Sequence, residues 1–541
     1  MLFLGDVFLY RCRIGQVFDT HKNQDFQVHT MVIKPHRDII RYIRTYMDRL
    51  FSNKVLSISI LEDQHKKDGF LIHPKAATDM IDVEALMYCF RRLPTHIFDI
   101  DNILLTPSMG MVIDAISFSE LRRSFTQARR RACYATGNTL IMTLQSYSDV
   151  HDIVPILTTF QIEHNKIHER LRGKYFETED DIADLLDLKV SQIEQLREIL
   201  GGITMKRFRQ MSNTKKHFRV KLKSKSTNHY EFHAGNWATN IKQRIEDMGF
   251  NRRDVYLVSS NTHAIANLLG GYALHIAGRL QRLEKQYIHI RERHNLHEID
   301  FGYFLLSRYL RDNPDEIATK LHFESMQGIT LNRDMSTEHL NSQIIDMSRI
   351  NHDCIDSRLK LKRRNCVIIN IDYPFGEEAH YVAKHLIMHL KHQLKGIFIM
   401  GKAGALCGKI ADLHVPSSVY DEVSAWRISL TNCLRKKQPA STVAAVHGTV
   451  LHNRPSLENY RRQRITSIEM ESGPFLRAIY DHYAKKRVQR QDIDMRRLPV
   501  KIGLIYYTSD LPLEGRTLAG PLSANGIAST YKAALTILRN I

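Results

Sequence analysis

The chain has 541 residues, 43% of them hydrophobic, and a formal net charge of +19 at pH 7. This length exceeds that of one ordinary domain, so about two or three domains are expected. No run of about 18 apolar residues occurs, so no membrane-spanning helix is predicted. The surplus of basic residues predicts anionic partners such as nucleotides, nucleic acid or a membrane surface.

Cysteine usage and the N-terminal sequence predict a cytoplasmic protein. The seven cysteines are scattered along the chain, and no two of them form a Cys-x-x-Cys pair. This usage fits a reducing compartment and gives neither a zinc nor a redox framework. Residues 1–7 have no basic segment before their apolar part, so no signal peptide is expected.

Basic residues gather in several short runs. They are either solvated helix faces and loops or contacts to nucleic acid. Aromatic residues that could stack on bases are sparse among them, and solvated surface is therefore the preferred interpretation. The runs are residues 122–123, 129–131, 215–216, 221–225 and 360–364.

The first 225 residues are predicted to form a mainly helical α+β region of unknown role. Apolar residues alternate with serine over 55–61, the pattern of a half-buried strand. Ser117 and Glu120 have capping-box spacing, which predicts the start of a helix. The polar, basic segment 215–228 lacks helical periodicity and is the predicted boundary. The predicted elements are strands over 55–61 and 139–144 and helices over 82–92, over 117–131 and within 151–201.

An α/β pattern begins after this boundary. A helix over 237–248 leads into a strand over 254–258, and another helix follows from Ala264. The loop between them, residues 259–263, is small and polar. Such a loop can bind an anion, because the first amides of the next helix lack intrahelical partners. The alternative is a plain helix cap at Asn261 or Thr262, and the sequence does not separate the two.

Residues 281–362 are charged and are predicted to form a helical insertion between strands. Residues 294–298 in this insertion, and residues 164–168 before it, carry the spacing of metal-ligand pairs. With 28 histidines in the chain, such spacings arise by chance, and no third ligand is identifiable. No metal site is therefore predicted.

The last third of the chain contains a βαβ pattern. A strand over 366–371 is followed by a turn at Gly376, a helix over 377–394 and a strand over 396–400. A glycine-rich turn then follows. This pattern predicts a parallel sheet, in which ligands bind beyond the carboxyl ends of the strands. The candidate binding residues at these ends are Gly376, Gly401, Lys402, Ala403 and Gly404.

Two acidic strand ends are expected at the same edge of this sheet. The first is Glu469-Met470-Glu471, where a strand gives way to a helix. The alternation of side chains along a strand puts Glu469 and Glu471 on one side and Met470 on the other. The second is Ser509-Asp510, at the end of the following strand.

Taken together, these segments resemble the type I nucleoside phosphorylase superfamily. That superfamily includes purine nucleoside phosphorylases, methylthioadenosine/S-adenosylhomocysteine nucleosidases and AMP nucleosidases. The resemblance lies in the strand and glycine-rich segment 396–405 with the following 410–416, in Glu469-Met470-Glu471, and in Ser509-Asp510. It covers residues 366–541, extends less firmly over 230–365 and does not reach residues 1–225. Where the family has glycine before the acid of the second segment, this chain has Ala411.

The resemblance implies a role for each of these residues. Asp510 would protonate or hydrogen-bond a purine at N7, and Glu471 would accept hydrogen bonds from the ribose hydroxyls. Met470 would pack under the sugar. Backbone around Gly448, Val450 and Leu451 would line the base. Glu469 and Ser509 are further candidates beside the two acids, and Lys402 is a candidate anion ligand or an exposed lysine.

The sequence also departs from the family pattern. The phosphorylases use an arginine in the first loop to hold phosphate, and the nucleosidases use a glutamate there to activate water. Residues 259–263 contain neither. Hydrolysis is slightly preferred because the arginine is missing.

These observations predict a C-terminal three-layer α/β domain, residues 226–541, with a mixed, mostly parallel sheet. The predicted activity is cleavage of the N-glycosidic bond of a purine nucleoside or nucleotide, by a nucleosidase or, if phosphate is used, a phosphorylase. The alternative is a non-catalytic nucleotide-sensing module whose basic N-terminal region contacts a partner or nucleic acid. A cytoplasmic homo-oligomer is expected, with no cofactor, with inorganic phosphate as co-substrate only in phosphorolysis, and with no membrane contact.

Overall fold

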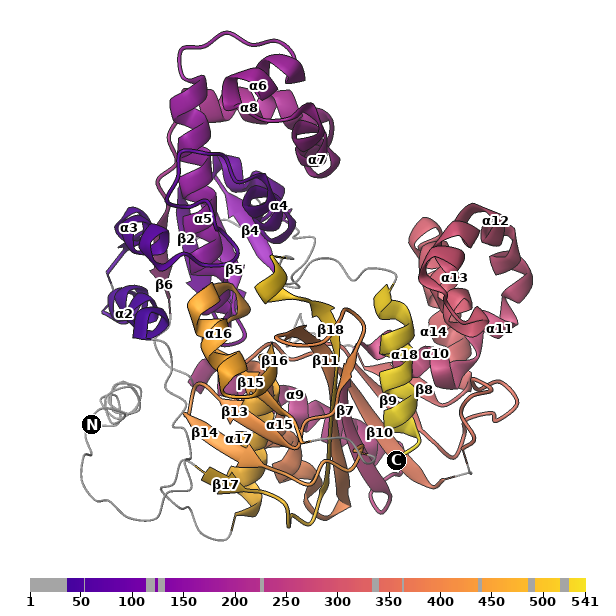
Figure 1. Cartoon of the computed structure of the whole chain (residues 1–541). Helices are drawn as coiled ribbons and strands as arrows, with labels where there is room; N and C mark the ends of the chain where they lie inside the picture. Colours follow the sequence, from indigo (N-terminus) through magenta and orange to yellow (C-terminus); the bar gives the residue numbers. More distant parts are fainter. Residues whose placement is uncertain are drawn as a thin grey trace, which may run out of the picture.

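The structure is a computed structural model that describes residues 37–541 except 53, 113–121, 125–131, 224–227, 333–339, 362–363, 436–439, 485–491 and 516–524. Two sheets organise these residues. One has six strands in the order β1-β6-β2-β5-β4-β3, and the other has twelve strands. Figure 1 shows the N-terminal elements as an arm above one side of the larger sheet and helices α11–α14 as a second arm on the other side.

The six-stranded sheet packs against a long buried helix, α5 (Tyr147–Leu171). Ser146 and Asp149 form the capping box that starts this helix. The strands are β1 (Leu56–Ser57), β2 (Asn102–Thr106), β3 (Arg122–Ser124), β4 (Cys133–Thr136), β5 (Thr139–Thr143) and β6 (Arg219–Leu222). The other helices are α2 (Arg37–Phe51), α3 (Ser59–Asp68), α4 (Val83–Arg92), α6 (Glu179–Leu186), α7 (Val190–Leu200) and α8 (Thr204–Asn213).

Most of the elements predicted for this region are confirmed, and two are corrected. The predicted strand over 55–61 ends after Ser57, and α3 begins at Ser59, because β1 pairs with β6 only through Leu56 and Ser57. Within the predicted helix 117–131, the described residues Arg122–Ser124 form strand β3, and the other residues lie outside the described parts of the chain. Strand pairing with β4 decides the conformation of this segment.

The larger sheet is parallel at its centre. Strands β10, β7, β11 and β18 run side by side in the same direction. Strand β16 pairs with the end of β11 in the opposite direction, and β15 and β13 continue parallel to β16. The bounds are β7 (Asp254–Ser260), β10 (Cys366–Asp372), β11 (Leu394–Ala405), β12 (Leu413–His414), β13 (Ser418–Asp421), β14 (Trp426–Ser429), β15 (Thr442–Ala445), β16 (Ile465–Glu469), β17 (Asp492–Asp494) and β18 (Lys501–Asp510).

Helices cover both faces of this sheet, so the C-terminal part is a mixed α/β structure in three layers. On one face, α9 (Asn228–Asp247), α15 (Glu378–Leu390) and α17 (Ser472–Tyr483) pack on residues such as Leu257 and Ile399. On the other face, α10 (Thr262–Gly270) and α18 (Asn525–Leu538) pack on residues such as Val258 and Ile368. The predicted βαβ unit is present, with β7 lying between β10 and β11.

Two details of the predicted C-terminal part are corrected. The helices of the insertion, α11 (Tyr272–His275), α12 (Ala277–His294), α13 (Glu298–Asp312) and α14 (Glu316–Met326), end before residue 329. Strands β8 (Ile329–Asn332) and β9 (Ser342–Asp346) follow and extend the sheet beside β10. The predicted glycine-rich turn is the last part of strand β11, because Gly401 and Gly404 leave room for the side chains of β18 beside them.

The two parts of the molecule share one hydrophobic core. The cluster that surrounds α5 continues without a break into the larger sheet, through Tyr420, Val446, Ile468 and Met470 and through Tyr460 of α16 (Arg454–Arg462). Backbone bonds also cross this junction, including Leu71 N–H to the carbonyl of His452 (2.9 Å). The N-terminal region is therefore packed directly onto the strand ends of the larger sheet.

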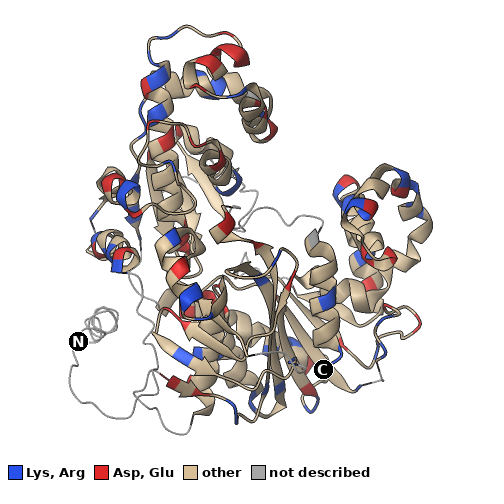
Figure 2. Ribbon diagram, in the orientation of Figure 1, with Lys and Arg blue, Asp and Glu red and all other residues tan. Residues whose placement is uncertain are grey.

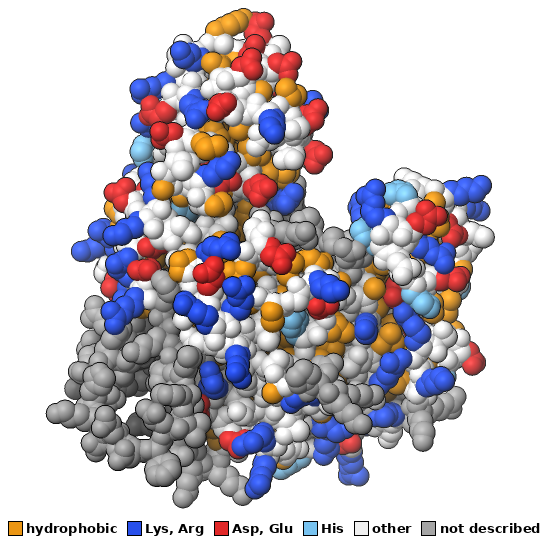
Figure 3. All heavy atoms as spheres, in the orientation of Figure 1, with side chains coloured by type: hydrophobic (Ala, Val, Ile, Leu, Met, Phe, Trp, Pro, Cys, Tyr) orange, Lys and Arg blue, Asp and Glu red, His pale blue; other side chains and the backbone are white. Residues whose placement is uncertain are grey.

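Charge is spread over the molecule. Figure 2 marks Lys and Arg positions along both arms and the loops below the sheet, and Figure 3 shows their side chains with acidic side chains interspersed on the arms. One residue of the predicted basic runs has a different role. Lys216 is buried and donates to the carbonyls of Phe98 (2.9 Å) and Ile100 (2.7 Å), so it fixes a loop instead of facing a partner. Among the described residues, no helix is long and apolar enough to cross a membrane.

Candidate functional site

Asp510 lies at the end of β18, immediately beside Gly404 of β11. Ala403 pairs with Thr508 and Gly404 pairs with Asp510, so Ser509 is an extra residue that forms a bulge. Such bulges turn side chains to new directions and are common beside active sites. A Cβ atom at position 404 would lie 2.9 Å from Oδ2 of Asp510. A larger residue at 404 would therefore displace the Asp510 carboxylate, which is 4% exposed.

Glu469 supports the turn between β16 and α17. Its Oε2 accepts the backbone N–H groups of Glu471 (2.8 Å) and Ser472 (2.9 Å), and the Ser472 hydroxyl donates to Oε1. The N–H groups at the start of a helix have no acceptor within the helix, and a carboxylate can accept hydrogen bonds from them. Glu469 is 2% exposed, and its oxygens are engaged inside the protein.

Met470 and Glu471 follow in this turn. The Met470 side chain lies against the loop after β10, since a Cβ atom at Gly376 would be 3.5 Å from Cε of Met470. Glu471 is half-buried, and one carboxylate oxygen accepts the N–H of Met470 at 3.3 Å. The two carboxylates thus have different roles. Glu469 accepts hydrogen bonds that stabilise the turn, and Glu471 is a residue of that turn with a half-buried side chain.

Glu471 and Asp510 follow the ends of two strands that both pair with the last part of β11. Ile468 of β16 lies opposite Gly404, and Asp510 of β18 also pairs with Gly404. Strand β16 ends at Glu469 and α17 begins at Ser472, so Met470 and Glu471 lie in the turn beyond the paired residues. Gly404 therefore has the end of β16 on one side and the end of β18 on the other.

The remaining predicted residues lie around these two acids. Ser509 donates to Asp510 and to the carbonyl of Ala403 (3.5 Å). Gly401 lies under the ring of Tyr506, and Lys402 is exposed on β11. Val450 and Leu451 have buried side chains in the shared core, and Gly448 lies against the backbone of His151, so the backbone of this segment faces α5.

The loop after β7 begins α10 with a capped N-terminus. The Asn261 side chain accepts the N–H of Ala264 at 3.2 Å, which is the capping arrangement expected as one of the two alternatives. Ser260 and Asn370 of the neighbouring strand are hydrogen-bonded at 2.7 Å beneath this loop.

A buried network of charges lies beneath the turn that carries Glu471. Arg477 of α17 pairs with Glu377, the residue after Gly376, and with Asp421 at the end of β13 (2.8 Å). Gly473 is required there because a Cβ atom would lie 2.6 Å from Oδ1 of Asp421. Burial alone would raise the pKa of Glu377, but Arg477 outweighs burial and lowers it. The guanidinium thus ties the Gly376 loop to α17 and β13.

A second part of this network reaches the N-terminal region. Glu422 accepts the hydroxyl of Tyr460 (2.6 Å) and lies 3.0 Å from Nδ1 of His447. Burial opposes ionisation of Glu422, but the hydrogen bond from His447 lowers its pKa to about 2. The His447 ring packs edge-to-face on His151 of α5, and Nδ1 of His151 lies 2.7 Å from the Tyr46 hydroxyl.

The pKa of Glu469 is shifted in the opposite direction to that of Glu422. Burial raises the pKa of Glu469 to about 7, and the nearby Asp421 adds to this effect. The hydrogen bonds from Ser472 and Glu471 oppose it and do not cancel it. The pKa values of Glu469 and Glu422 are therefore shifted in opposite directions, that of Glu469 upward and that of Glu422 downward.

Sequence reasoning missed the residues that connect these parts. Ser148, His151, Arg477 and His447 were not singled out, because each gains its role from contacts across long stretches of chain. The capping-box sequence Ser146–Asp149 was a usable signal for the start of α5, and the glycine of Ser472-Gly473 was a signal for a close approach at α17. Neither signal identifies the residue, distant in the sequence, that makes the contact.

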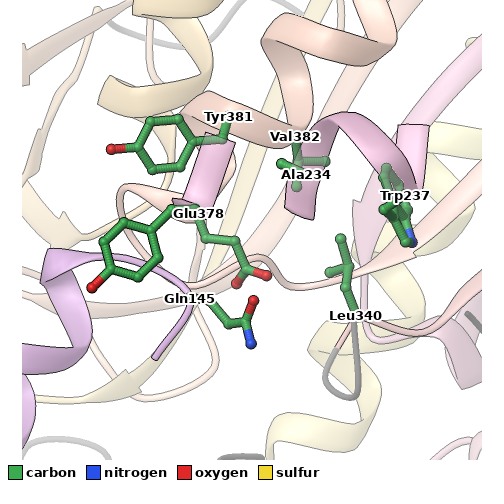
Figure 4. Close-up of a pocket in the computed structure, with 8 residues that line it drawn as sticks. Gln145, Ala234, Trp237, Leu340, Glu378, Tyr381 and Val382 are labelled. Atoms are coloured by element: carbon green, nitrogen blue, oxygen red, sulfur yellow. The ribbon is translucent and has the colours of Figure 1, made fainter. Parts of the chain in front are cut away.

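The described residues hold no group of three His, Cys, Asp or Glu side chains that could bind a metal ion. Of the histidine pairs with metal-like spacing, His168 instead bonds the carbonyl of Met211 through Nδ1 (3.0 Å), and His297 caps α13. A cavity of about 10 Å³ lies beside the Gly376 loop, between Gln145, Glu378 and helix α9. Figure 4 shows the Gln145 amide and the Glu378 carboxylate pointing toward each other at this cavity.

The protein family is shown by a sequence comparison. The model of a family of unknown function, DUF6909, matches residues 58–541. The chain belongs to this family. A comparison with curated proteins gives no match. The matched range of the DUF6909 family includes all of the candidate site and, except for strand β1, both sheets.

Comparison with solved structures finds similarity to nucleosidases. One is the Campylobacter jejuni 5′-methylthioadenosine/S-adenosylhomocysteine nucleosidase, at 11% identity and a TM-score of 0.31, covering 53% of this chain and 98% of that chain. Another is the futalosine hydrolase of Helicobacter pylori strain 26695, at 10% identity and a TM-score of 0.30, with the same coverage. A third is the S. pneumoniae nucleosidase bound to a transition-state inhibitor, at 9% identity and a TM-score of 0.28, covering 42% of this chain and 95% of that chain.

Proposed function

We propose that this protein cleaves the N-glycosidic bond of a purine nucleoside or nucleotide. The observation that carries this proposal is the placement of two carboxylates, Asp510 and Glu471, at the ends of strands that flank Gly404 of β11. Asp510 is buried, and Glu471 is half-buried in the turn between β16 and α17. The glycine at 404 supports the proposal further, because it gives Asp510 room at a defined position.

The chemistry of bond cleavage fits these two positions. Breaking the bond builds negative charge on the departing base and positive charge on the sugar. An acid at the base, here Asp510, contributes about 10²–10⁴-fold by proton donation. A carboxylate at the sugar, here Glu471, accepts the hydroxyl hydrogen bonds and stabilises the cationic ring. Met470, packed between Glu471 and the Gly376 loop, would form the floor under the sugar.

The attacking species is proposed to be water. Residues 259–263 at the N-terminus of α10 carry no arginine that would hold phosphate. Asn261 uses its side chain to cap α10, and Arg477 is engaged by Glu377 and Asp421. Alignment of a nucleophile on the far side of the sugar accounts for the rest of the acceleration.

A base-release assay tests the proposal directly. The protein is incubated with AMP, adenosine, inosine, guanosine and methylthioadenosine, with and without phosphate, and free base is measured. Release without phosphate is expected for at least one substrate. Release that requires phosphate would replace hydrolysis by phosphorolysis. Binding without release would favour a nucleotide-sensing module, and the absence of both would refute the proposal.

Substitution of Asp510 tests the role of the acid. Asp510→Asn keeps the shape of the side chain and removes the proton that is donated, so kcat is expected to fall by about 10²–10⁴-fold. Ligand affinity, measured by calorimetry, should change much less. Glu458→Gln is the matched control, because the Glu458 carboxylate forms a surface ion pair with Arg454. An unchanged kcat for Asp510→Asn would show that the acid is misassigned.

A further inference from the structure

We propose that the N-terminal turn of α5 is part of the candidate site and that Ser148 is a positioning residue for the Gly376 loop. The inference rests on the proposed function for its meaning, but its contacts belong to the structure itself. The N-terminal region would then hold the wall of the site that faces the sugar.

The contact between Ser148 and the loop is close and directional. The Ser148 hydroxyl accepts the backbone N–H of Glu377 at 3.0 Å. A Cβ atom at position 376 would lie 2.3 Å from Oγ of Ser148 and 2.6 Å from its Cβ. Gly376 also has φ +57°, which favours glycine. The loop thus has glycine at the one position where the serine side chain presses against it.

The same loop touches the proposed sugar site on its other side. The Cβ position of Gly376 is 3.5 Å from Cε of Met470, so Ser148, Gly376 and Met470 form one stack from α5 to the turn of Glu471. Ser148 is 3% exposed and Met470 is 5% exposed. Movement of the loop would therefore be transmitted to the floor of the site.

Two further contacts fix the position of α5 itself. The Ser146 hydroxyl lies 3.5 Å from the carbonyl of Phe375, and the His151 ring packs on His447. The hydrophobic core of the N-terminal region continues to Met470 and Ile468. The turn of α5 is thus held from both sides and can act as a rigid support for the loop.

Loss of this support has a defined consequence. If the loop adopts the conformation held by Ser148 only part of the time, the apparent Kd rises by the inverse of that fraction. Bound substrate would restore this conformation, so kcat at saturation should change little. Ser148→Ala is therefore expected to raise KM or Kd about 10-fold and to change kcat by less than about twofold.

Hydrogen exchange provides a readout that does not depend on activity. In Ser148→Ala, the amide of Glu377 should exchange faster, while the amides of β13 keep their protection. Ser52→Ala is the matched control, because Ser52 is exposed directly after α2 and its hydroxyl donates to the carbonyl of Arg49 in that helix. Unchanged exchange of Glu377 in Ser148→Ala would overturn the positioning role, whether or not the wild-type protein cleaves nucleosides.

A pair of substitutions tests the contact in the other direction. Gly376→Ala should weaken ligand binding more than Ser148→Ala, because the new Cβ collides with the Ser148 side chain. Ser148→Gly removes both colliding atoms, so the double variant should bind more tightly than Gly376→Ala alone. Equal affinity of the double variant and Gly376→Ala would contradict the proposal. A wild-type protein that neither binds nor cleaves any nucleoside refutes the proposed function and not the contact, which the exchange experiment tests separately.

Discussion

The molecule contains two buried polar networks that differ in what they hold. The first lies inside the N-terminal region and runs from Tyr42 through His65 and His73 to Glu163 and Lys166. Burial and the neighbouring His73 keep the pKa of His65 well below its usual range. Burial alone would raise the pKa of Glu163, but His73 and Lys166 lower it. This network closes within one region.

The second network lies beneath the candidate site and connects loops of different strands. Arg477 holds Glu377 and Asp421, and Glu422 holds His447 and Tyr460. These residues are adjacent to the turns that carry Met470, Glu471 and Gly376. Buried charges therefore have two roles in this protein. The first network joins helices of one core, and the second fixes the geometry of the candidate site.

The strongest way to separate the two networks is to remove Arg477. Arg477→Met leaves Glu377 and Asp421 buried without their cation, which costs about 3–5 kcal/mol of unfolding free energy. Urea denaturation measures this loss. Arg454→Met is the control, because Arg454 pairs with Glu458 on the surface, and it should cost less than about 1 kcal/mol. A loss of similar size in both variants would contradict the distinction.

Glu469 gives the second network a distinct pH dependence. Its pKa is about 7 in the folded protein and 4.5 by reference. Between these values the unfolded chain ionises while the folded protein keeps its proton, so stability is full below pH 4.5 and falls as pH rises through about 7. Glu469→Gln removes this titration and also one of the two acceptor oxygens, so its stability relative to the wild type should rise by up to about 3 kcal/mol from pH 4 to pH 8. Equal stabilisation at the two pH values, in urea denaturation, would exclude Glu469 as the titrating group.

Removal of Glu163 tests the first network. Glu163→Ala leaves Nε2 of His73 and the N–H of Asp82 without this acceptor and removes the anion beside Lys166, and the expected cost is about 1–3 kcal/mol. Affinity for a nucleoside should stay within about twofold of the wild type when the folded protein is assayed. Glu169→Ala, on the exposed side of the same helix, is the control. A specific loss of affinity in Glu163→Ala would show that the first network also shapes the site.

The smallest effect is expected at Lys402. This lysine is exposed at the edge of the candidate site, and Lys402→Ala should change the unfolding free energy by less than about 0.5 kcal/mol. If Lys402 contacts a 5′-phosphate, KM for AMP should rise while KM for adenosine stays unchanged. A parallel change in both KM values would assign the effect to the fold instead of to substrate charge.

The sequence by itself determined the elements that depend on local pattern. The hydrophobic strands and the intervening helix predict the βαβ unit, and the structure contains it around β7, β10 and β11. The predicted helices over 82–92 and within 151–201 correspond to α4, α6 and α7, whereas α5 begins at Tyr147, before the predicted range. The two acidic strand ends were also readable, since Glu469 and Asp510 end β16 and β18.

The tertiary structure decided which of these residues face one another. The roles of Glu469 and Glu471 separate only because α17 begins at Ser472 and its first amides take one carboxylate. The pairing of β16 and β18 with Gly404 of β11 brings the two acidic strand ends together, and strand pairing is a non-local property. The contact of Ser148 with the Gly376 loop joins residues 229 positions apart in numbering, counted from Ser148 to Glu377. No periodicity or motif encodes such a contact, because packing of the shared core produces it.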